Sequence, residues 1–346
     1  MHPRSFAIAA VLALVPVGFV VPAGQAVVPT CDGQEATIVG TDNSDILRGT
    51  DGPDVVVLGA GNDTFIGKGG DDVICGGPGN DVIYPGTGNN TVFGDGGSDT
   101  IYEAAGDDHL SGGPGRDTLK YNLYGGTGLR LDARIGKATS SNGTDLFSGF
   151  ETYIGSNGSD TLIGSQASER IVGFGGPKDV IYGFGGNDHL VGDSTEVYID
   201  AGSGDDWVAA NSTSGRVLLG DGNDHLLYRY QSAGSVFVGG NGYDGVDLVY
   251  GPAGYVVDLD RNVLSYRNTA LNHSSVLTGF ENVLGSPGPD RITGNDLPNF
   301  LAGRRGNDSV LGLGGDDHLF GGEGTDTADG GRGGDKCLYF EHETSC

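Results

Sequence analysis

The stretch Gly76-Gly77-Pro78-Gly79-Asn80-Asp81-Val82-Ile83-Tyr84 is one of nine consecutive nonapeptides that fill residues 40–120 without a remainder. In every copy the sixth residue is acidic or, once, an asparagine, and the eighth is apolar. The fourth is a glycine in all copies but the first. A fixed period of this kind decides the architecture, because each repeat is one unit that stacks on its neighbours. The sixth residues are Asp45, Asp54, Asp63, Asp72, Asp81, Asn90, Asp99, Asp108 and Asp117.

Each nonapeptide divides into a turn and a short strand. The glycines allow positive φ, so the first six residues can form a tight turn whose carbonyls point inward. The last three residues are rich in β-branched and aromatic side chains, which favour a strand whose middle side chain faces away from its neighbours. Stacking aligns the eighth residues in an apolar ladder and the sixth residues in rows of carboxylates. Because carboxylates repel one another in a low-dielectric stack, these rows require cations, and oxygen-only ligand sets favour Ca²⁺.

The repeat resembles the RTX (hemolysin-type) calcium-binding nonapeptide, Gly-Gly-x-Gly-x-Asp-x-apolar-x. Gly49-Thr50-Asp51-Gly52-Pro53-Asp54 and Gly321-Gly322-Glu323-Gly324-Thr325-Asp326 are close copies. The resemblance implies an all-β fold, a parallel β-roll in which two nonapeptides form each 18-residue coil of a right-handed β-solenoid. It also implies that several Ca²⁺ ions lie between successive turns, held by turn carbonyls and by the sixth-position aspartates. In residues 40–120 these ligands are Asp45, Asp54, Asp63, Asp72, Asp81, Asp99, Asp108 and Asp117, and Asn90 departs from the pattern.

The nine-residue period stops after residue 120 and returns twice. Residues 121–154 and 248–284 are predicted to be strand-rich inserts, and we expect paired coils there rather than linkers. Residues 155–247 form a degenerate second block, in which Glu169, Val197 and Gly215 replace the aspartate. Residues 285–338 form a regular third block. By the same resemblance, the calcium ligands of the later blocks are Asp160, Asp179, Asp188, Asp206, Asp224, Asp244, Asp290, Asp308, Asp317, Asp326 and Asp335.

The first 26 residues are predicted to be a cleavable signal peptide, with Arg4 ahead of an apolar run and small residues at its end. This predicts a secreted, extracellular protein whose mature chain has no membrane span. A membrane anchor is the alternative, but Pro16 and Gly18 interrupt the apolar run, which is short for a span. Residues 27–39 and 339–346 are predicted to cap the two ends of the stack.

Four cysteines in an exported chain imply disulfides, for which three connectivities exist. Cys31 precedes the first repeat and Cys75 ends the fourth, whereas Cys337 and Cys346 frame the last ten residues. Pairing neighbours, Cys31 with Cys75 and Cys337 with Cys346, would fasten each end of the stack, where a solenoid most needs a cap. We favour this pairing over four free thiols.

The net charge of −27 argues against nucleic acid and anionic membrane surfaces as partners. The 67 glycines suit thin stacked coils, and the acidity indicates a largely unfolded chain when calcium is absent. No His-Glu-x-x-His or Gly-x-Ser-x-Gly motif occurs, so we do not expect an enzyme. Four histidines follow a sixth-position aspartate, and we interpret them as repeated surface residues rather than a transition-metal site; they are His109, His189, His225 and His318.

These observations predict a secreted protein that binds calcium ions and folds as it binds them. A structural or cell-surface, adhesive role is the first hypothesis, with a cell-surface or matrix partner. The alternative is an accessory or diverged module of a secreted hydrolase or toxin.

Overall fold

A computed structural model describes residues 28–346 except 104, 122–127, 212–213, 230–233 and 268–273. The predicted signal peptide, residues 1–26, lies outside the described residues. All regular elements in the described part are strands, and none of its residues belongs to a helix that could cross a membrane.

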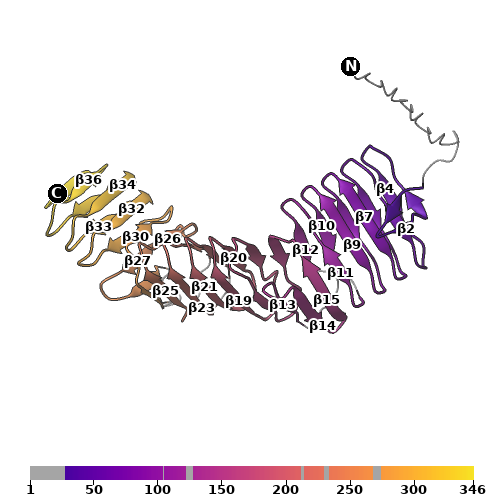
Figure 1. The fold of residues 1–346 in the computed structure, drawn as a ribbon. Coiled ribbons are helices and arrows are strands. Elements are labelled where there is room, and N and C mark those ends of the chain that lie inside the picture. Colours follow the sequence, from indigo (N-terminus) through magenta and orange to yellow (C-terminus); the bar gives the residue numbers. More distant parts are fainter. Residues whose placement is uncertain (1–27, 104, 122–127, 212–213, 230–233, 268–273) are drawn as a thin grey trace, which may run out of the picture.

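Two long sheets run along a bent stack of coils, with one sheet on its concave side and the other on its convex side (Figure 1). The concave sheet has 15 strands, all parallel. Its strands are β4 (Ile46–Arg48), β6 (Thr64–Ile66), β8 (Val82–Tyr84), β10 (Thr100–Tyr102), β12 (Thr118–Lys120), β16 (Thr152–Ile154), β18 (Arg170–Val172), β20 (His189–Gly192), β22 (Trp207–Ala210), β24 (His225–Tyr228), β26 (Gly245–Leu248), β30 (Asn282–Leu284), β32 (Phe300–Arg305), β34 (His318–Glu323) and β36 (Lys336–Leu338).

The convex sheet is mostly parallel and contains the strands of both inserts. In spatial order its strands are β3 (Ile38–Val39), β5 (Val55–Val57), β7 (Val73–Pro78), β9 (Thr91–Gly96), β11 (His109–Ser111), β15 (Gly143–Ser148), β14 (Lys137–Ser140), β13 (Arg130–Asp132), β17 (Thr161–Ile163), β19 (Lys178–Gly185), β21 (Glu196–Ser203), β23 (Ser214–Asp221), β25 (Val236–Asn241), β29 (Ser274–Thr278), β28 (Val263–Tyr266), β27 (Tyr255–Asp258), β31 (Arg291–Thr293), β33 (Ser309–Leu311), β35 (Thr327–Asp329) and β37 (His342–Thr344). A short antiparallel hairpin, β1 (Thr30–Cys31) and β2 (Gln34–Glu35), lies at the N-terminal end.

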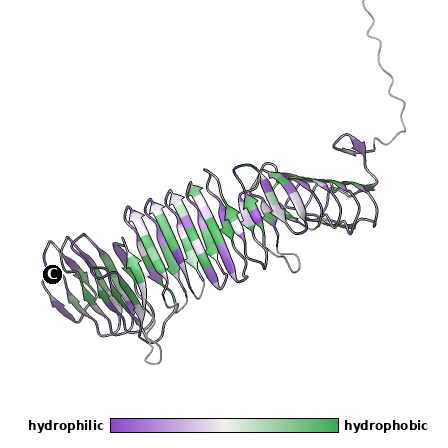
Figure 2. Cartoon of the chain, turned by 90° about the horizontal axis from the view of Figure 1, so that it is seen from below, coloured by the Kyte–Doolittle hydropathy of each residue, from purple (hydrophilic) through white to green (hydrophobic). Residues whose placement is uncertain are grey.

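The chain alternates between the two sheets, so that residues 18 apart pair side by side. Phe65 pairs with Ile83, and Ile83 pairs with Ile101. This register confirms the predicted parallel β-roll of 18-residue coils. The eighth residue of each nonapeptide points between the sheets and is fully buried in most coils, as Ile74 and Ile83 are. Each such side chain contributes about 1.5–3 kcal/mol of burial, and Figure 2 shows hydrophobic residues along the strands of the middle block.

Glycine at the fourth position of a repeat is needed because successive turns touch. Gly79 has φ 149°, and a Cβ there would overlap the carbonyl oxygen of Gly61 in the preceding coil. The turns are therefore held at the spacing of the strands, which brings their sixth residues into register.

The inserts differ from the paired coils expected from the sequence. In the first, β13, β14 and β15 form an antiparallel meander within the convex sheet, and β27, β28 and β29 repeat this arrangement in the second. Across each insert the convex sheet gains two strands more than the concave sheet. At about 4.8 Å per strand this adds about 10 Å to one side, which explains why Figure 1 shows a bend at each insert.

Both favoured disulfides are present. Cys31 is bonded to Cys75, and Cys337 is bonded to Cys346. The first joins the N-terminal hairpin to β7, and the second joins β36 to the end of the chain. The two cross-links therefore fasten the two ends of the stack, as the positions of the cysteines predicted.

Candidate functional site: two rows of buried carboxylates

The sixth residues of the repeats form two rows, one along each edge of the stack. Row 1 precedes the strands of the concave sheet, and row 2 precedes those of the convex sheet. Row 1 contains Asp45, Asp63, Asp81, Asp99, Asp117, Glu151, Glu169, Asp188, Asp206, Asp224, Asp244, Glu281, Asn299, Asp317 and Asp335. Row 2 contains Asp54, Asp72, Asn90, Asp108, Asp145, then Asp160 and Asp179, and finally Asp290, Asp308, Asp326 and Glu341.

One hydrogen bond repeats along each row and fixes the carboxylates. The backbone N–H of Asp63 donates to Oδ1 of Asp81 at 2.8 Å, and that of Asp81 donates to Oδ1 of Asp99 at 2.7 Å. Each carboxylate is thus held by the coil before it, about one strand spacing from its neighbours. All of the predicted aspartates lie in these rows.

The second carboxylate oxygen of most row residues is buried and has no hydrogen-bond partner among the described residues. A buried, unpaired carboxylate oxygen is costly, so such groups require a cation or a proton. These oxygens belong to Asp63, Asp72, Asp81, Asp99, Asp108, Asp117, Asp179, Asp188, Asp206, Asp224, Asp244, Asp308, Asp317, Asp326 and Asp335. The oxygen-only chemistry of this set fits a hard cation such as Ca²⁺.

Asn90 shows which oxygens surround a hydrogen-bond donor in such a turn. Its Nδ2 donates to the carbonyls of Gly86 and Gly88, at 3.1 and 3.0 Å, and to Oδ1 of Asp108 at 3.0 Å. The amide nitrogen therefore collects two turn carbonyls and the carboxylate of the next coil. The same oxygens of an Asp-containing turn converge where a cation would be held.

A second kind of turn satisfies its carboxylate with protein groups. Oδ2 of Asp54 accepts hydrogen bonds from the backbone N–H and the hydroxyl of Thr50, at 2.7 and 3.0 Å. We call a turn of this kind a capped turn. Each capped turn has a side-chain hydroxyl or amide at the second position of its repeat. The capping pairs are Thr41 with Asp45, Thr50 with Asp54, Ser156 with Asp160, Ser165 with Glu169, Ser286 with Asp290 and Asn295 with Asn299.

The capped turns are the first two turns of each repeat block. Asp45, Asp54, Asp160 and Asp290, which the sequence predicts as ligands, therefore differ from the other predicted aspartates in needing no cation to complete their hydrogen bonds. Their ligand role stays a prediction.

Burial raises the pKa of many row carboxylates, Asp81, Asp99 and Asp206 among them. The pKa of Asp81 rises from 3.8 to about 6, and those of Asp99 and Asp206 rise to about 7. Loss of hydration is the largest cause and the charges of adjacent row carboxylates add to it, whereas the backbone N–H bond acts in the opposite direction. The rows thus resist carrying their full negative charge unless a cation balances it.

Row 2 is interrupted in the second block, where the sequence lacks aspartates. Val197 replaces a carboxylate there and is buried in the hydrophobic core. The backbone N–H of Asp179 therefore has no carboxylate in the next coil to which it could donate, and it donates to the hydroxyl of Ser194 instead. Apolar packing therefore takes over one edge of the second block, while row 1 continues along the other edge.

Five acidic residues of the rows were not assigned as ligands from the sequence: Asp145, Glu151, Glu169, Glu281 and Glu341. Glu151 accepts the N–H of Asp117, and Glu281 accepts that of Asp244. A signal for both was present, because each precedes a buried strand residue by two positions, as a sixth-position aspartate does. Glu341 lies in the predicted C-terminal cap, yet it accepts the N–H of Asp326 and so extends row 2.

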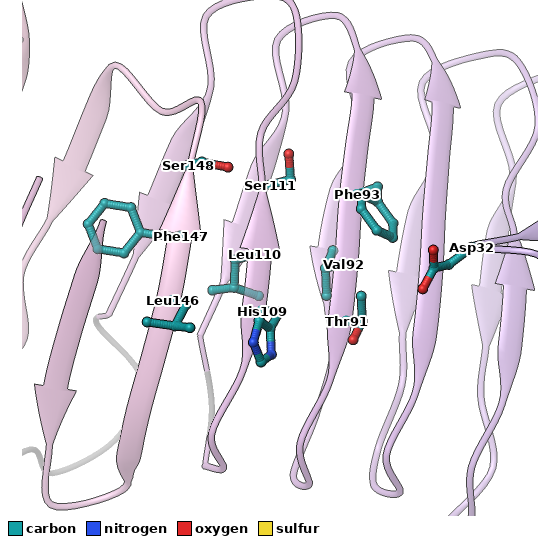
Figure 3. A pocket seen from close by; sticks show the side chains of 10 residues that line it. All are labelled: Asp32, Thr91, Val92, Phe93, His109, Leu110, Ser111, Leu146, Phe147 and Ser148. Carbon is teal, nitrogen blue, oxygen red and sulfur yellow. The ribbon is translucent and has the colours of Figure 1, made fainter. Parts of the chain in front are cut away.

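The histidines of the repeats lie on the strands next to the rows. His109 and His318 are exposed, and His189 and His225 are half-buried. A groove of about 550 Å³ lies beside His109 on the convex sheet. Figure 3 shows His109 and Ser111 at opposite ends of β11, with Asp32 beyond Phe93. No hydrogen bond joins His109, Ser111 and Asp32 in the part of the chain that the structure describes.

Comparison with known families finds one match that extends through the three blocks. The sequence profile described as "RTX calcium-binding nonapeptide repeat (4 copies)" matches residues 39–74, 76–102, 84–119, 146–176, 178–196, 182–217 and 299–337. Together these segments cover more than half of the chain. A search of curated protein sequences found no match.

Proposed function

Because the chain belongs to the RTX calcium-binding nonapeptide-repeat family, we propose that it is a secreted protein whose β-roll folds as it binds several extracellular Ca²⁺ ions. The observation that carries this proposal is the set of buried row oxygens without a hydrogen-bond partner among the described residues. In the first block, each full coil after the capped turns contributes two such oxygens, and the coil that contains Asn90 contributes one.

The open turns would hold the ions. In the turn of Asp81, the ligands would be the free oxygen of Asp81, the carboxylate of Asp99 and, by analogy with Asn90, the carbonyls of Gly77 and Gly79. A bound calcium ion supplies positive charge that balances the row. Since the turns exist only in the stacked chain, the free energy of ion binding becomes free energy of folding.

Neighbouring ion sites would share carboxylates, so binding at one coil would favour binding at the next. Each coil contacts only the coils beside it, which makes the stability of such a stack a sum of local and nearest-neighbour terms. Extracellular calcium modules bind at about 10⁻⁴–10⁻³ M. The chain would therefore stay loose at low calcium and fold after export.

We infer a structural or adhesive role at a cell surface rather than catalysis. The bent stack presents two long faces, a shape that repeat proteins use for extended contacts. Two disulfides suit an oxidising compartment, which supports the extracellular assignment. Binding of the purified chain to immobilised cell-wall glycans, with calcium and with a chelator, tests this role. Retention that requires calcium supports it, and equal absence of retention in both conditions contradicts it.

The calcium assignment is tested by counting ions. Equilibrium dialysis of the chain from residue 27 onward should give several Ca²⁺ ions per molecule at millimolar calcium. A stoichiometry of zero or one would contradict the proposal.

A further inference from the structure

Glu103 places an extra carboxylate inside row 2. It is the first residue of the repeat 103–111, a position whose side chain points at the row: a Cβ built on Gly67 would lie 3.0 Å from Oδ2 of Asp72. The first insert begins in the coil that follows Glu103, and the stack has space for the Glu103 side chain at this junction. It is only 3% exposed.

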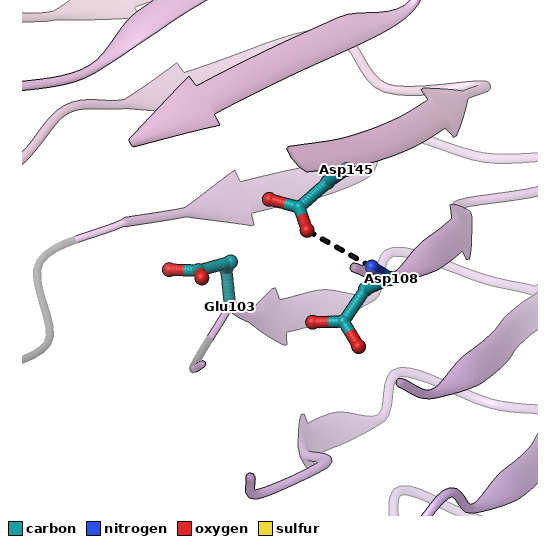
Figure 4. Close-up of side chains that lie close together, drawn as sticks. All are labelled: Glu103, Asp108 and Asp145. Carbon is teal, nitrogen blue, oxygen red and sulfur yellow. Dashed lines mark hydrogen bonds between the residues drawn. The ribbon is translucent and has the colours of Figure 1, made fainter. Parts of the chain in front are cut away.

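Glu103 meets two other buried carboxylates, Asp108 of row 2 and Asp145 of the insert strand β15. One oxygen from each lies within 4.8 Å of the others, and Figure 4 shows the three groups converging. The N–H of Asp108 donates to Oδ1 of Asp145 at 3.0 Å, and the hydroxyl of Tyr121 donates to Oδ2 of Asp145 at 2.9 Å. Oε1 of Glu103 and Oδ2 of Asp108 are buried with no partner in the described structure.

No salt bridge balances this cluster in the part of the chain that the structure describes, because none of those formed there includes Glu103, Asp108 or Asp145. Carboxylates this close repel one another, and the repulsion is stronger in a buried place because the effective dielectric constant is lower there than in water. Three ionised groups in one buried place therefore need a cation, or one of them must hold a proton.

We propose that Glu103, Asp108 and Asp145 hold one hard divalent cation, with calcium the best match, at a site that differs from the other row turns in its third carboxylate. Three carboxylates without nitrogen or sulfur ligands suit calcium's oxygen coordination. The site joins the first block to the first insert, and it rests on the proposed function in sharing Asp108 and Asp145 with row 2. Tyr121 is a positioning residue, because its hydroxyl orients Asp145.

The site has room for water to complete the ligand shell. A cavity of about 10 Å³ is lined by Glu103, Tyr121, Leu129 and Ser140, among others. That volume is about one water-sized sphere. Calcium takes six to eight oxygens, so three carboxylates together with water form a plausible shell for it.

The second insert provides an internal comparison. Leu146 pairs with His109 across the first insert, and Val276 pairs with Val236 across the second. The residues before them correspond, so Asp145 matches Ser275 and Asp108 matches Ser235. Glu103, two residues after the ladder residue Ile101, matches Tyr228, two after Leu226. The second insert thus has three hydroxyls where the first has three carboxylates, and the proposed site belongs to the first insert alone.

The test counts bound calcium in the full chain from residue 27 by equilibrium dialysis, with circular dichroism on the same samples. Glu103→Gln should bind one ion fewer than the unmodified chain, with the β-sheet signal retained at saturating calcium. Glu103→Ala removes the same carboxylate without leaving a buried amide, which keeps the test decisive if Glu103→Gln does not fold. Glu35→Gln is the matched control, an exposed glutamate of the N-terminal hairpin that belongs to neither row, and its count should not change.

Asp63→Asn provides the reference for a row site. If it loses at least one ion while Glu103→Gln and Glu103→Ala keep the full count, the further site is overturned and the row sites stand. If Asp63→Asn also keeps the full count, the proposed function fails as well. The competing state is a protonated Glu103 without an ion, since burial and the charges of Asp145 and Asp108 raise its pKa to about 9; that state predicts an unchanged ion count in both Glu103 variants.

Discussion

Replacing Asp81 by asparagine separates the structural and the calcium-dependent parts of one row site. Oδ1 of Asp81 accepts the N–H of Asp63 at 2.8 Å, and an asparagine keeps that acceptor. Its Oδ2 is buried without a partner among the described residues, and the substitution turns this atom into an NH₂ group. The change therefore removes one negative charge and one ligand with little change in shape.

The two effects have opposite signs. Asp81 has Asp63 and Asp99 as row neighbours, each about 4.8 Å away by strand spacing. Each pair repels by at most about 3.5 kcal/mol at an effective dielectric constant of 20. Without calcium, Asp81→Asn should therefore stabilise the folded chain, aided by amide bonds like those of Asn90.

With calcium, the variant should need more of it. Loss of a group that only supports a metal ligand lowers affinity by about 10–100-fold, so loss of a ligand should raise the calcium midpoint of folding at least about tenfold if the site governs it. Circular dichroism during calcium titration measures this midpoint, and the β-sheet signal that remains in chelator measures the apo stability.

The matched control is Asp51→Asn, an exposed aspartate of the same block. It should leave the calcium midpoint and the apo stability unchanged. An Asp81→Asn midpoint equal to that of the unmodified chain, or a loss of stability in chelator, would refute the assignment of Asp81 as a calcium ligand.

Further predictions follow from the same contacts. Asp54→Asn, in a turn capped by Thr50, should shift the calcium midpoint much less than Asp81→Asn, and an equal shift in the titration would show that capped turns also bind ions. The pKa values of Asp81 and Asp99, about 6 and 7, exceed the usual 3.8, so the folded chain binds more protons than the unfolded chain between these values. In chelator, the stability of the folded chain should therefore be greatest in acid and should fall as the pH rises through 6 to 7. A thermal midpoint that rises with pH in this range would contradict this. Replacing both Cys31 and Cys75 by serine opens a cross-link across 44 residues and should cost up to about 4 kcal/mol in urea unfolding, whereas no change would show that the N-terminal end needs no fastening. Ile83→Ala at a fully buried position should cost about 2–5 kcal/mol at saturating calcium, and a cost below 1 kcal/mol would contradict a packed core.

The repeat made the coils predictable from the sequence. A nine-residue period with an apolar eighth residue leaves few ways to bury a ladder such as Phe65, Ile83 and Ile101, and the pairing of residues 18 apart follows from it. The rows were predictable for the same reason. The disulfides followed from the positions of the cysteines at the two ends.

Other features depend on contacts that periodicity does not encode. The meanders of the two inserts pair strands antiparallel, which local sequence alone does not distinguish from another coil. Thr50 looks like a variant of the consensus glycine, and only its bonds to Asp54 show that it satisfies the carboxylate. Glu103 and Asp145 lie far apart in sequence, and the insert brings them together.

The most direct test of the central claim is the far-ultraviolet circular dichroism of the chain from residue 27, at neutral pH, in excess chelator and during calcium titration. The account predicts a weak β-sheet signal in chelator and a cooperative gain as calcium rises to millimolar concentration. A full β-sheet signal in chelator, with a thermal midpoint that does not respond to added calcium, would contradict it.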